Sequence, residues 1–277
     1  MKPKRVLIVY KKSTYEIYFL EHRHPLFREF RASHELHHKT LKAVQVFLKE
    51  KGVKYRVVYR AKKINYAPYD LIITVGGDGT FLEAARRVTK QKIMGINSDP
   101  KNSVGSFCTA NSGTFKAILI RFFGGRAKLM QLNRLKLILN GKAIGVNASN
   151  DVLISHRNPA AMSRYWVKVG GAREEQRSSG LWVSTAAGST GAIHTAGGKI
   201  LDRRSKKVQY MPRELNRGLG MKYRLRGGLI PDTKSLKIGS MMREGMLYID
   251  GPHFQIPFRY GDALQILNSP SSLNVVH

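Results

Sequence analysis

The chain has 277 residues, with 48 lysines and arginines against 18 aspartates and glutamates, which gives a formal net charge of +30. A hydrophobic content of 42% is enough to bury a sizeable core, and it excludes a wholly disordered chain. The single cysteine, Cys108, excludes an internal disulfide and any site built from several cysteines. No apolar run approaches the roughly 18 residues of a membrane span. The apolar run at residues 6–10 is too short for a signal peptide, so we expect a cytoplasmic protein without a membrane partner.

The strong positive charge calls for a polyanionic partner, either nucleic acid or a phosphorylated small molecule. The cations are dispersed along the chain, except in residues 199–226, where ten lysines and arginines accompany only two acids. No RNP-like, KH-like or zinc-finger pattern is present. Nucleic acid is therefore not expected as a partner, despite the charge.

The first part of the chain alternates strand and helix patterns. Predicted strands cover residues 6–10, 55–59, 71–75 and 92–96, and predicted helices cover residues 33–50 and 81–90. This alternation indicates a parallel sheet with helices on its faces. We therefore predict a Rossmann-like α/β domain over residues 1–125.

The remaining part of the chain has the pattern of antiparallel strands. Asn140-Gly141 lies between two alternating runs, which is the strongest short signal for a β-hairpin. Gly170-Gly171 and Asp250-Gly251 resemble further hairpin turns. We predict a β-rich antiparallel domain over residues 126–277, of which the last segment could pack back on the first domain.

The most specific signal is the segment Leu71–Thr80, in which a buried strand runs into Gly-Gly-Asp-Gly-Thr and a helix start. In open α/β sheets, ligands bind beyond the carboxyl ends of the strands. Glycines there let the backbone approach phosphates, and the helix N-terminus adds N–H donors. The carboxylate of Asp78 suits a general base or a partner for Mg²⁺. The plainer alternative is a tight turn in which Asp78 or Thr80 is the helix N-cap.

Two later segments are weaker signals when each is taken alone. Residues 184–191 are rich in small and hydroxyl side chains, which could surround a nucleotide but also suit a flexible loop. The pair Asn150-Asp151 precedes a predicted strand, and an amide beside a carboxylate suits ribose hydroxyls and base edges. An Asx turn is the ordinary explanation of such a pair.

Together, these motifs resemble those of the NAD kinase family. That family has GGDGT, then an Asn-acid pair, a Gly-Ser-Thr segment and a late Asp-Gly, in this order along the chain. The matching positions here are Gly76–Thr80, Asn150-Asp151, Gly188–Thr190 and Asp250-Gly251. Residues 97–100, Asn-Ser-Asp-Pro, are similar to a segment of the divergent, mitochondrial-type branch. The resemblance covers residues 6–267. It implies an enzyme that uses ATP to phosphorylate NAD to NADP.

The resemblance also implies a role for each matching residue. Asp78 would be the catalytic base that takes the proton of the 2′-hydroxyl of the adenosine ribose of NAD. The residues implied to bind the phosphates are Gly76, Gly77, Gly79, Thr80 and Asn97. Those implied to bind the dinucleotide are Asn150, Asp151, Ser189, Thr190, Gly191 and Thr195. Mg²⁺ would enter with ATP as the cofactor, and the chain would assemble as a homodimer or homotetramer.

The chain departs from the common family pattern at two places. Ser179 stands where the family has an aspartate before a glycine, and Gly191-Ala192 stands where it has Ala-Tyr. A carboxylate and an aromatic ring are therefore missing from the expected dinucleotide pocket. We therefore expect the pocket to discriminate only weakly at the nicotinamide end of the dinucleotide, so that NADH is accepted beside NAD⁺.

Two alternative functions are compatible with parts of the sequence. GGDGT also occurs in lipid kinases of the diacylglycerol and sphingosine type, and the charge would suit a non-enzymatic, basic nucleic-acid-binding protein. No Asn-Pro-x-(Ser/Ala)-Gly segment follows the first strand, where lipid kinases of this superfamily carry one, and this favours an NAD kinase. Because Walker and G-x-G-x-x-G motifs are absent, an ordinary P-loop enzyme or Rossmann oxidoreductase is disfavoured.

Residues 34–38 match H-E-x-x-H, a signature of metalloproteases. On a helix, His34 and His38 share one face, but Leu41 and Gln45 continue that stripe, as on the edge of a core-facing surface. The spacing indicates no third ligand. We interpret the match as fortuitous and predict no metal-binding residues.

Overall fold

The computed structural model describes residues 3–277, and the chain divides into two compact units. The first unit contains the chain up to Gln131 and, in addition, the terminal segment Leu273–His277. The second unit is Leu132–Ser272. The division lies a few residues beyond the expected 125/126, because the strand β6 (Leu129–Leu132) still belongs to the sheet of the first unit.

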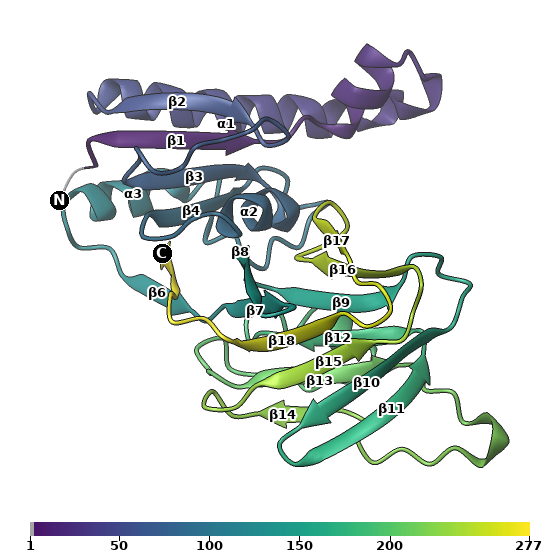
Figure 1. The fold of residues 1–277 in the computed structure, drawn as a ribbon. Helices are drawn as coiled ribbons and strands as arrows, with labels where there is room; N and C mark the ends of the chain where they lie inside the picture. Colours follow the sequence, from purple (N-terminus) through teal and green to yellow (C-terminus); the bar gives the residue numbers. More distant parts are fainter. Residues whose placement is uncertain (1–2) are drawn as a thin grey trace. The chain divides into compact units, whose positions relative to one another are not determined.

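The first unit is built on a mainly parallel sheet with the strand order β2-β1-β3-β4-β19-β6, in which β1 to β4 and β6 are labelled in Figure 1. The short strand β5 pairs with β4. Its other strands are β1 (Arg5–Tyr10), β2 (Lys54–Tyr59), β3 (Leu71–Gly76), β4 (Lys92–Asn97), β5 (Ala110–Asn111) and β19 (Leu273–Val276). Its α-helices are α1 (Arg31–Glu50), α2 (Asp78–Ala85) and α3 (Phe115–Phe123). β3 is buried along its whole length, as expected for a parallel strand covered on both faces.

The helices of the first unit differ from the prediction in two ways. α2 covers Asp78–Ala85 instead of residues 81–90, because it starts directly after the glycines. Before α1, the chain forms a π-helix, η1 (Tyr15–Glu21), and a 3₁₀-helix, η2 (Pro25–Phe30), which local pattern did not predict. Both lie beyond the carboxyl ends of β1 and β2 (Figure 1).

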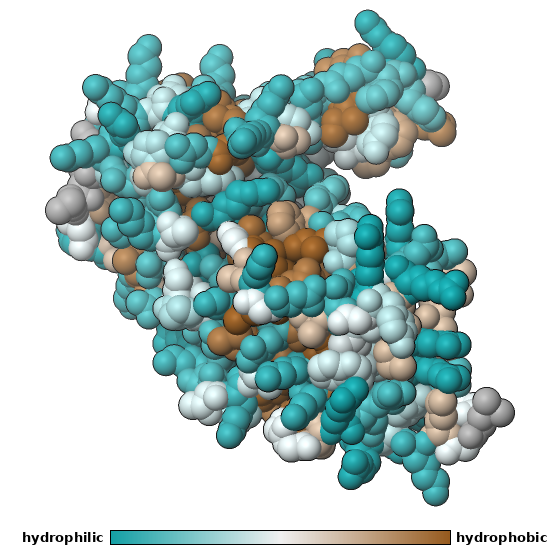
Figure 2. All heavy atoms as spheres, in the orientation of Figure 1, coloured by the Kyte–Doolittle hydropathy of each residue, from teal (hydrophilic) through white to brown (hydrophobic). Residues whose placement is uncertain are grey.

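Hydrophobic residues are exposed on the extension formed by η1 and η2. Hydrophobic atoms are visible there among the hydrophilic surface (Figure 2). The exposed side chains of this segment include Tyr18, Leu20, Leu26 and Phe30. In contrast, α1 buries Leu41, Val44 and Leu48 against the sheet, in agreement with the predicted apolar stripe.

The second unit consists of two six-stranded antiparallel sheets among the described residues, with strand orders β11-β10-β15-β18-β7-β8 and β14-β13-β12-β9-β16-β17. The strands of the first of these sheets are β7 (Leu135–Leu139), β8 (Lys142–Ala148), β10 (Ser163–Val169), β11 (Ala172–Ser178), β15 (Leu236–Ser240) and β18 (Ala263–Asn268). Those of the other sheet are β9 (Asp151–His156), β12 (Gly180–Ser184), β13 (Val208–Arg213), β14 (Gly228–Ile230), β16 (Gly245–Ile249) and β17 (Gln255–Pro257). Two short helices, α4 (Ala192–Thr195) and η3 (Gly218–Gly220), lie in the connections.

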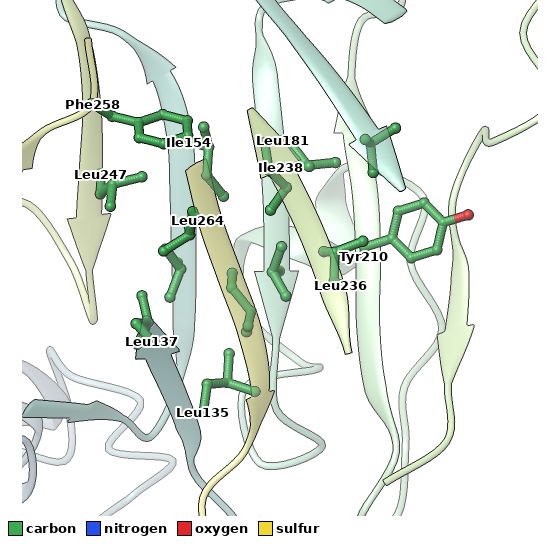
Figure 3. Close-up of a cluster of buried hydrophobic side chains, with 14 of the residues drawn as sticks. Leu135, Leu137, Ile154, Leu181, Tyr210, Leu236, Ile238, Leu247, Phe258 and Leu264 are labelled. Atoms are coloured by element: carbon green, nitrogen blue, oxygen red, sulfur yellow. The ribbon is translucent and has the colours of Figure 1, made fainter. Parts of the chain in front are cut away.

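The core of the second unit lies between its two sheets. Leu137, Ile238 and Leu264 come from one sheet and pack in the same cluster as Ile154 and Leu181 from the other (Figure 3). The alternation of buried and exposed residues along these strands fits a sheet with one covered face.

The predicted hairpin turns occur at the expected places. Asn140 and Gly141 both have positive φ, of 49° and 79°, as a two-residue turn between twisted antiparallel strands requires. Gly170-Gly171 joins β10 to β11, and Asp250-Gly251 opens a longer connection between β16 and β17.

The predicted fold, an α/β domain with a parallel sheet followed by a β-rich antiparallel domain, is confirmed. No helix in residues 3–277 has the length and apolar character needed to cross a membrane.

Candidate active site

The glycine segment lies at the carboxyl end of β3 and leads directly into α2. Gly76 has a φ of +154°, and a β-carbon there would lie 2.5 Å from Thr80 Oγ1. A β-carbon at Gly77 would lie 2.5 Å from Ser103 Oγ. Only glycine leaves room for these side chains so close to the backbone. The turn itself therefore requires Gly76 and Gly77, whether or not they also contact a ligand.

Asp78 is the first residue of α2, and the N-cap of this helix is Gly77. The alternative in which Asp78 or Thr80 caps the helix is therefore wrong. The carboxylate of Asp78 instead accepts the N–H groups of Ser106 at 2.9 Å and Phe107 at 2.7 Å, and so holds a loop beside the helix N-terminus. Thr80 is buried, and its hydroxyl has no hydrogen-bond partner among the described residues.

Two cations that sequence analysis did not single out lie beside the glycines. Arg60 Nη1 is 3.3 Å from the position that a β-carbon would take at Gly79, and Lys11 Cγ is 3.4 Å from the equivalent position at Gly76. Burial lowers the pKa of Lys11, the charge of Arg60 lowers it further, and Asp99 acts in the opposite direction. Cations and a helix N-terminus at one place favour the binding of phosphate.

A signal for these cations was present in the sequence. Lys11 directly follows β1, and Arg60 directly follows β2. Both strands run parallel to β3 in one sheet, so their carboxyl ends lie at the same edge. The rule that ligands bind at this edge could have identified both side chains.

Asn97 ends β4 and pairs in register with Gly76. Its Nδ2 donates to the carbonyl of Ser103 at 2.9 Å, and its Oδ1 accepts the N–H of Asp99 at 3.1 Å. A β-carbon at Gly105, whose φ is +64°, would lie 2.3 Å from Asn97 Nδ2. The amide of Asn97 therefore shapes the loop that borders the glycine segment.

In the second unit, the Asn-acid pair lies in a turn that the late Asp-Gly motif supports. The carboxylate of Asp250 accepts the N–H groups of Ser149 at 3.0 Å and Asn150 at 2.7 Å. The backbone N–H of Asp250 donates to the carbonyl of Asp151 at 2.9 Å. Asn150 Nδ2 in turn donates to Asp151 Oδ2 at 3.0 Å. The two motifs, about 100 residues apart, form one hydrogen-bonded unit.

The Gly-Ser-Thr segment lies against the same turn. A β-carbon at Gly188 would stand 2.3 Å from the carbonyl oxygen of Asn150, and one at Gly191 would stand 3.7 Å from Asn150 Oδ1. Ser189 is buried, and its hydroxyl donates to the carbonyl of Ala186 at 2.7 Å and accepts the N–H of Leu201 at 2.9 Å. Ser189 therefore holds its own segment in shape.

Thr190 and Thr195 lie before and at the end of α4, whose N-cap is Gly191. Both threonines are exposed, so their hydroxyls are open to a ligand. The structure thus brings Asn150, Asp151 and the Gly-Ser-Thr segment together, with the two threonines along the same segment.

Asp151 has a strongly perturbed acidity. Burial, and secondarily the charge of Asp250, raises its pKa to about 7. Near neutral pH, its carboxyl group can therefore donate a hydrogen bond as well as accept one. A buried carboxyl group with such a pKa is typical of a functional site.

Comparison with known proteins identifies the family to which the chain is related. A family model described as the ATP-NAD kinase N-terminal domain matches residues 17–123. A probable NADH kinase from Oryza sativa subsp. japonica is 31% identical over 264 residues, which cover 87% of this chain and 81% of that protein. This chain belongs to the NAD kinase family. Family membership favours the NAD kinase prediction over the lipid-kinase and nucleic-acid-binding alternatives.

Two solved structures of the NAD kinase family have the same fold. An NAD kinase from Archaeoglobus fulgidus in complex with ATP aligns with a TM-score of 0.74 at 20% identity, over 99% of this chain and 93% of that one. Yeast NADH kinase complexed with NADH aligns with a TM-score of 0.73 at 17% identity, over 99% of this chain and 83% of that one.

Ser179, where the chain departs from the NAD kinase pattern, lies beside a carboxylate in the structure. The hydroxyl of Ser179 donates to the carboxylate of Glu214. Both residues line a cavity of ≈ 420 Å³ that also contains the rings of Trp182 and Tyr248. Ala192, the second departure, is not among the residues that line this cavity.

Proposed function

We propose that this member of the NAD kinase family transfers the γ-phosphoryl group of ATP to the 2′-hydroxyl of the adenosine ribose of NAD, which yields NADP. The observation that carries the proposal is the position of Asp78 between two glycines at a helix N-terminus, with Lys11 and Arg60 beside those glycines. This set combines a proton acceptor with groups that bind phosphate.

In the proposed reaction, Asp78 takes the proton of the attacking hydroxyl. Two backbone N–H groups already orient its carboxylate, and ionised carboxylate oxygens have further lone pairs for a substrate proton. Lys11 and Arg60 would neutralise charge on the phosphates. Phosphoryl transfer depends mainly on positioning and charge neutralisation, which these groups supply.

We propose Mg²⁺ as the cofactor that accompanies ATP, and when bound it would supply charge neutralisation for the transferred phosphoryl group. If Asp78 held the ion instead of acting as the base, its carboxylate oxygens would suit this hard cation.

The second unit is proposed to bind the dinucleotide. Asn150 and Asp151 would hydrogen-bond its ribose or adenine, and the exposed hydroxyls of Thr190 and Thr195 would add further contacts. Gly191 lies near the Asn150 amide and leaves space for the ligand. The cavity beside Ser179 and Glu214 would receive a more distant part of the substrate.

A direct assay tests the proposed activity. The purified protein is incubated with Mg²⁺-ATP and either NAD⁺ or NADH, and NADP or NADPH is measured with a dehydrogenase specific for the phosphorylated cofactor. We expect product with both dinucleotides. Failure with both, or phosphorylation of diacylglycerol or a sphingoid base in their place, would overturn the proposal.

Two further properties are proposed on the family resemblance and the sequence. The protein would form a homodimer or homotetramer, which light scattering of the eluted protein measures directly. It would act in the cytoplasm, which imaging of the tagged protein in its own cell tests.

A further inference from the structure

A cluster of metal-ligating side chains lies where η1 packs beside the first turns of α1. Its members are Glu16, His34 and His38, and one ligand atom of each lies within 4.8 Å of the others. His34 and His38 are four residues apart on α1, so they share one face, and their ring centroids are 4.3 Å apart. All three side chains are half-buried.

The spacing of these atoms fits a small divalent ion. His38 Nε2 and Glu16 Oε2 are 3.4 Å apart. Two tetrahedral ligands at the usual zinc–nitrogen and zinc–oxygen distances of about 2.0–2.2 Å are separated by about 3.4 Å. Two imidazoles and one carboxylate are also a common ligand set for zinc with one position left open.

A further side chain orients one of the ligands. Ser13 Oγ is 2.8 Å from His34 Nδ1, and it also accepts the backbone N–H of Glu16 at 3.0 Å. This contact occupies Nδ1 and leaves Nε2 of His34 for an ion. Histidines that bind metals usually have the other ring nitrogen fixed by such a partner.

We propose that Glu16, His34 and His38 bind one divalent transition-metal ion of the zinc class, with a fourth position open to water. The ion would join η1 to α1. Glu16 lies eighteen positions before His34 on a separate element, which explains why the spacing of the histidines did not indicate it.

The site differs from that of the metalloproteases whose signature the sequence matches. The carboxylate of Glu35 is paired with Arg31 at 2.8 Å, and both side chains are mostly exposed. The ligand set therefore takes its carboxylate from Glu16 and leaves out the glutamate of the motif. The proposed site binds the ion and holds η1 against α1. No hydrolytic step is assigned to it.

The test uses the full chain without a histidine tag, stripped with chelator and titrated with Co²⁺ as a visible probe and with Zn²⁺ as competitor. We expect one Co²⁺ per chain, with absorption bands that one equivalent of Zn²⁺ abolishes. Glu16→Gln and His38→Gln should each lower the affinity at least about 100-fold. Ser13→Ala should lower it by about 10–100-fold, as loss of an orienting partner does.

Two matched controls separate the cluster from its surroundings. Glu35→Gln changes the other glutamate of the segment, and His22→Gln changes an exposed histidine outside the cluster. Both should bind Co²⁺ as the unmodified chain does, and circular dichroism checks that every variant folds. The proposal is overturned if the unmodified chain binds no stoichiometric Co²⁺ or Zn²⁺, if binding survives both ligand substitutions, or if Glu35→Gln weakens it as much as Glu16→Gln. If a variant misfolds, the titration of the unmodified chain still shows whether the protein binds one metal ion per chain.

Discussion

Gly188 and Asn150 are in such close contact that a β-carbon on Gly188 would stand 2.3 Å from the Asn150 carbonyl oxygen. The same carbonyl accepts the N–H of Thr185 at 3.0 Å. The turn that carries the Asn-acid pair and the Gly-Ser-Thr segment is thus one packed unit. A change in one part must displace the other.

Gly188→Ala should destabilise the second unit by about 1–3 kcal/mol, the usual cost of inserting an atom into a packed region. It should also weaken binding of the dinucleotide, since Asn150 must move. Urea unfolding and the Michaelis constant for NAD⁺ measure the two effects. Gly171→Ala is the control, because a β-carbon there meets nothing within 4 Å. Equal stability of the two variants would contradict the packing argument.

Asn150→Ala should raise the Michaelis constant for the dinucleotide more than it lowers turnover. The backbone of Asn150 holds the turn through Asp250 and Thr185, so loss of the side-chain amide leaves the turn in place. A group that binds substrate equally in the ground and transition states affects mainly the Michaelis constant. Steady-state kinetics at several NAD⁺ concentrations measure it.

Asp250→Ala is the companion variant, because it removes the acceptor of two backbone N–H groups and should lower stability. If Asn150→Ala instead lowers stability as much and leaves the kinetics unchanged, its side chain serves only the turn.

The raised pKa of Asp151 predicts a pH dependence of stability. Its native pKa of about 7 exceeds the ordinary value of 3.8. Between these values the native carboxyl is protonated while the unfolded one is ionised. The free energy of unfolding therefore falls as the pH rises from 3.8 to about 7 and is level above that.

Asp151→Asn does not titrate, so it isolates this contribution. Relative to this variant, the unmodified chain should be more stable at pH 5 than at pH 8, as urea unfolding at both values measures. If the unmodified chain and Asp151→Asn differ in free energy of unfolding by the same amount at pH 5 and pH 8, Asp151 has an ordinary pKa.

Glu214 provides a test of dinucleotide selectivity. Its carboxylate binds Ser179 in the cavity, and the oxidised nicotinamide ring carries a positive charge that the reduced ring lacks. If the ring lies there, Glu214→Gln should lower the preference for NAD⁺ over NADH. Because Glu214 is exposed, the change should be about two- to fivefold in the ratio of kcat/KM values.

Asp232→Asn, an exposed carboxylate outside the cavity, controls for net charge and should leave the ratio unchanged. A ratio unaffected by Glu214→Gln would place the nicotinamide elsewhere. For the unmodified chain, we expect NADH to be phosphorylated beside NAD⁺.

The features that the sequence predicted well are those set by local pattern. β3 is a continuous apolar run before glycines, and the Asn140-Gly141 turn needs positive φ at both residues, which this pair tolerates. The close approaches at Gly76 and Gly188 fall on motifs that the sequence already marked.

The features that it did not predict depend on pairing between distant segments. Glu214 reaches Ser179 because β12 and β13 are neighbours, with the N–H of Ser179 donating to Arg213 at 2.9 Å. Lys11 and Arg60 reach the glycines only because β1 and β2 lie on one side of β3. No periodicity within a segment indicates its neighbours in a sheet.

Asp78→Asn is the decisive variant for the proposed reaction. The amide keeps the size of the side chain and can still accept one backbone N–H, but it cannot take a proton. If Asp78 is the base, turnover should fall by about 10²–10⁴ while the affinity for ATP is retained. If it acts by holding Mg²⁺, more Mg²⁺ should restore part of the activity.

A third reading is that Asp78 only holds the loop at Ser106 and Phe107, so that its loss lowers stability and ATP affinity together. Asp70→Asn is the matched control, because Asp70 also accepts two backbone N–H groups, those of Lys4 at 2.7 Å and Arg5 at 3.1 Å, at the opposite end of β3. Both variants should lose similar stability. Only Asp78→Asn should lose turnover, and full activity in that variant would rule out a base at this position.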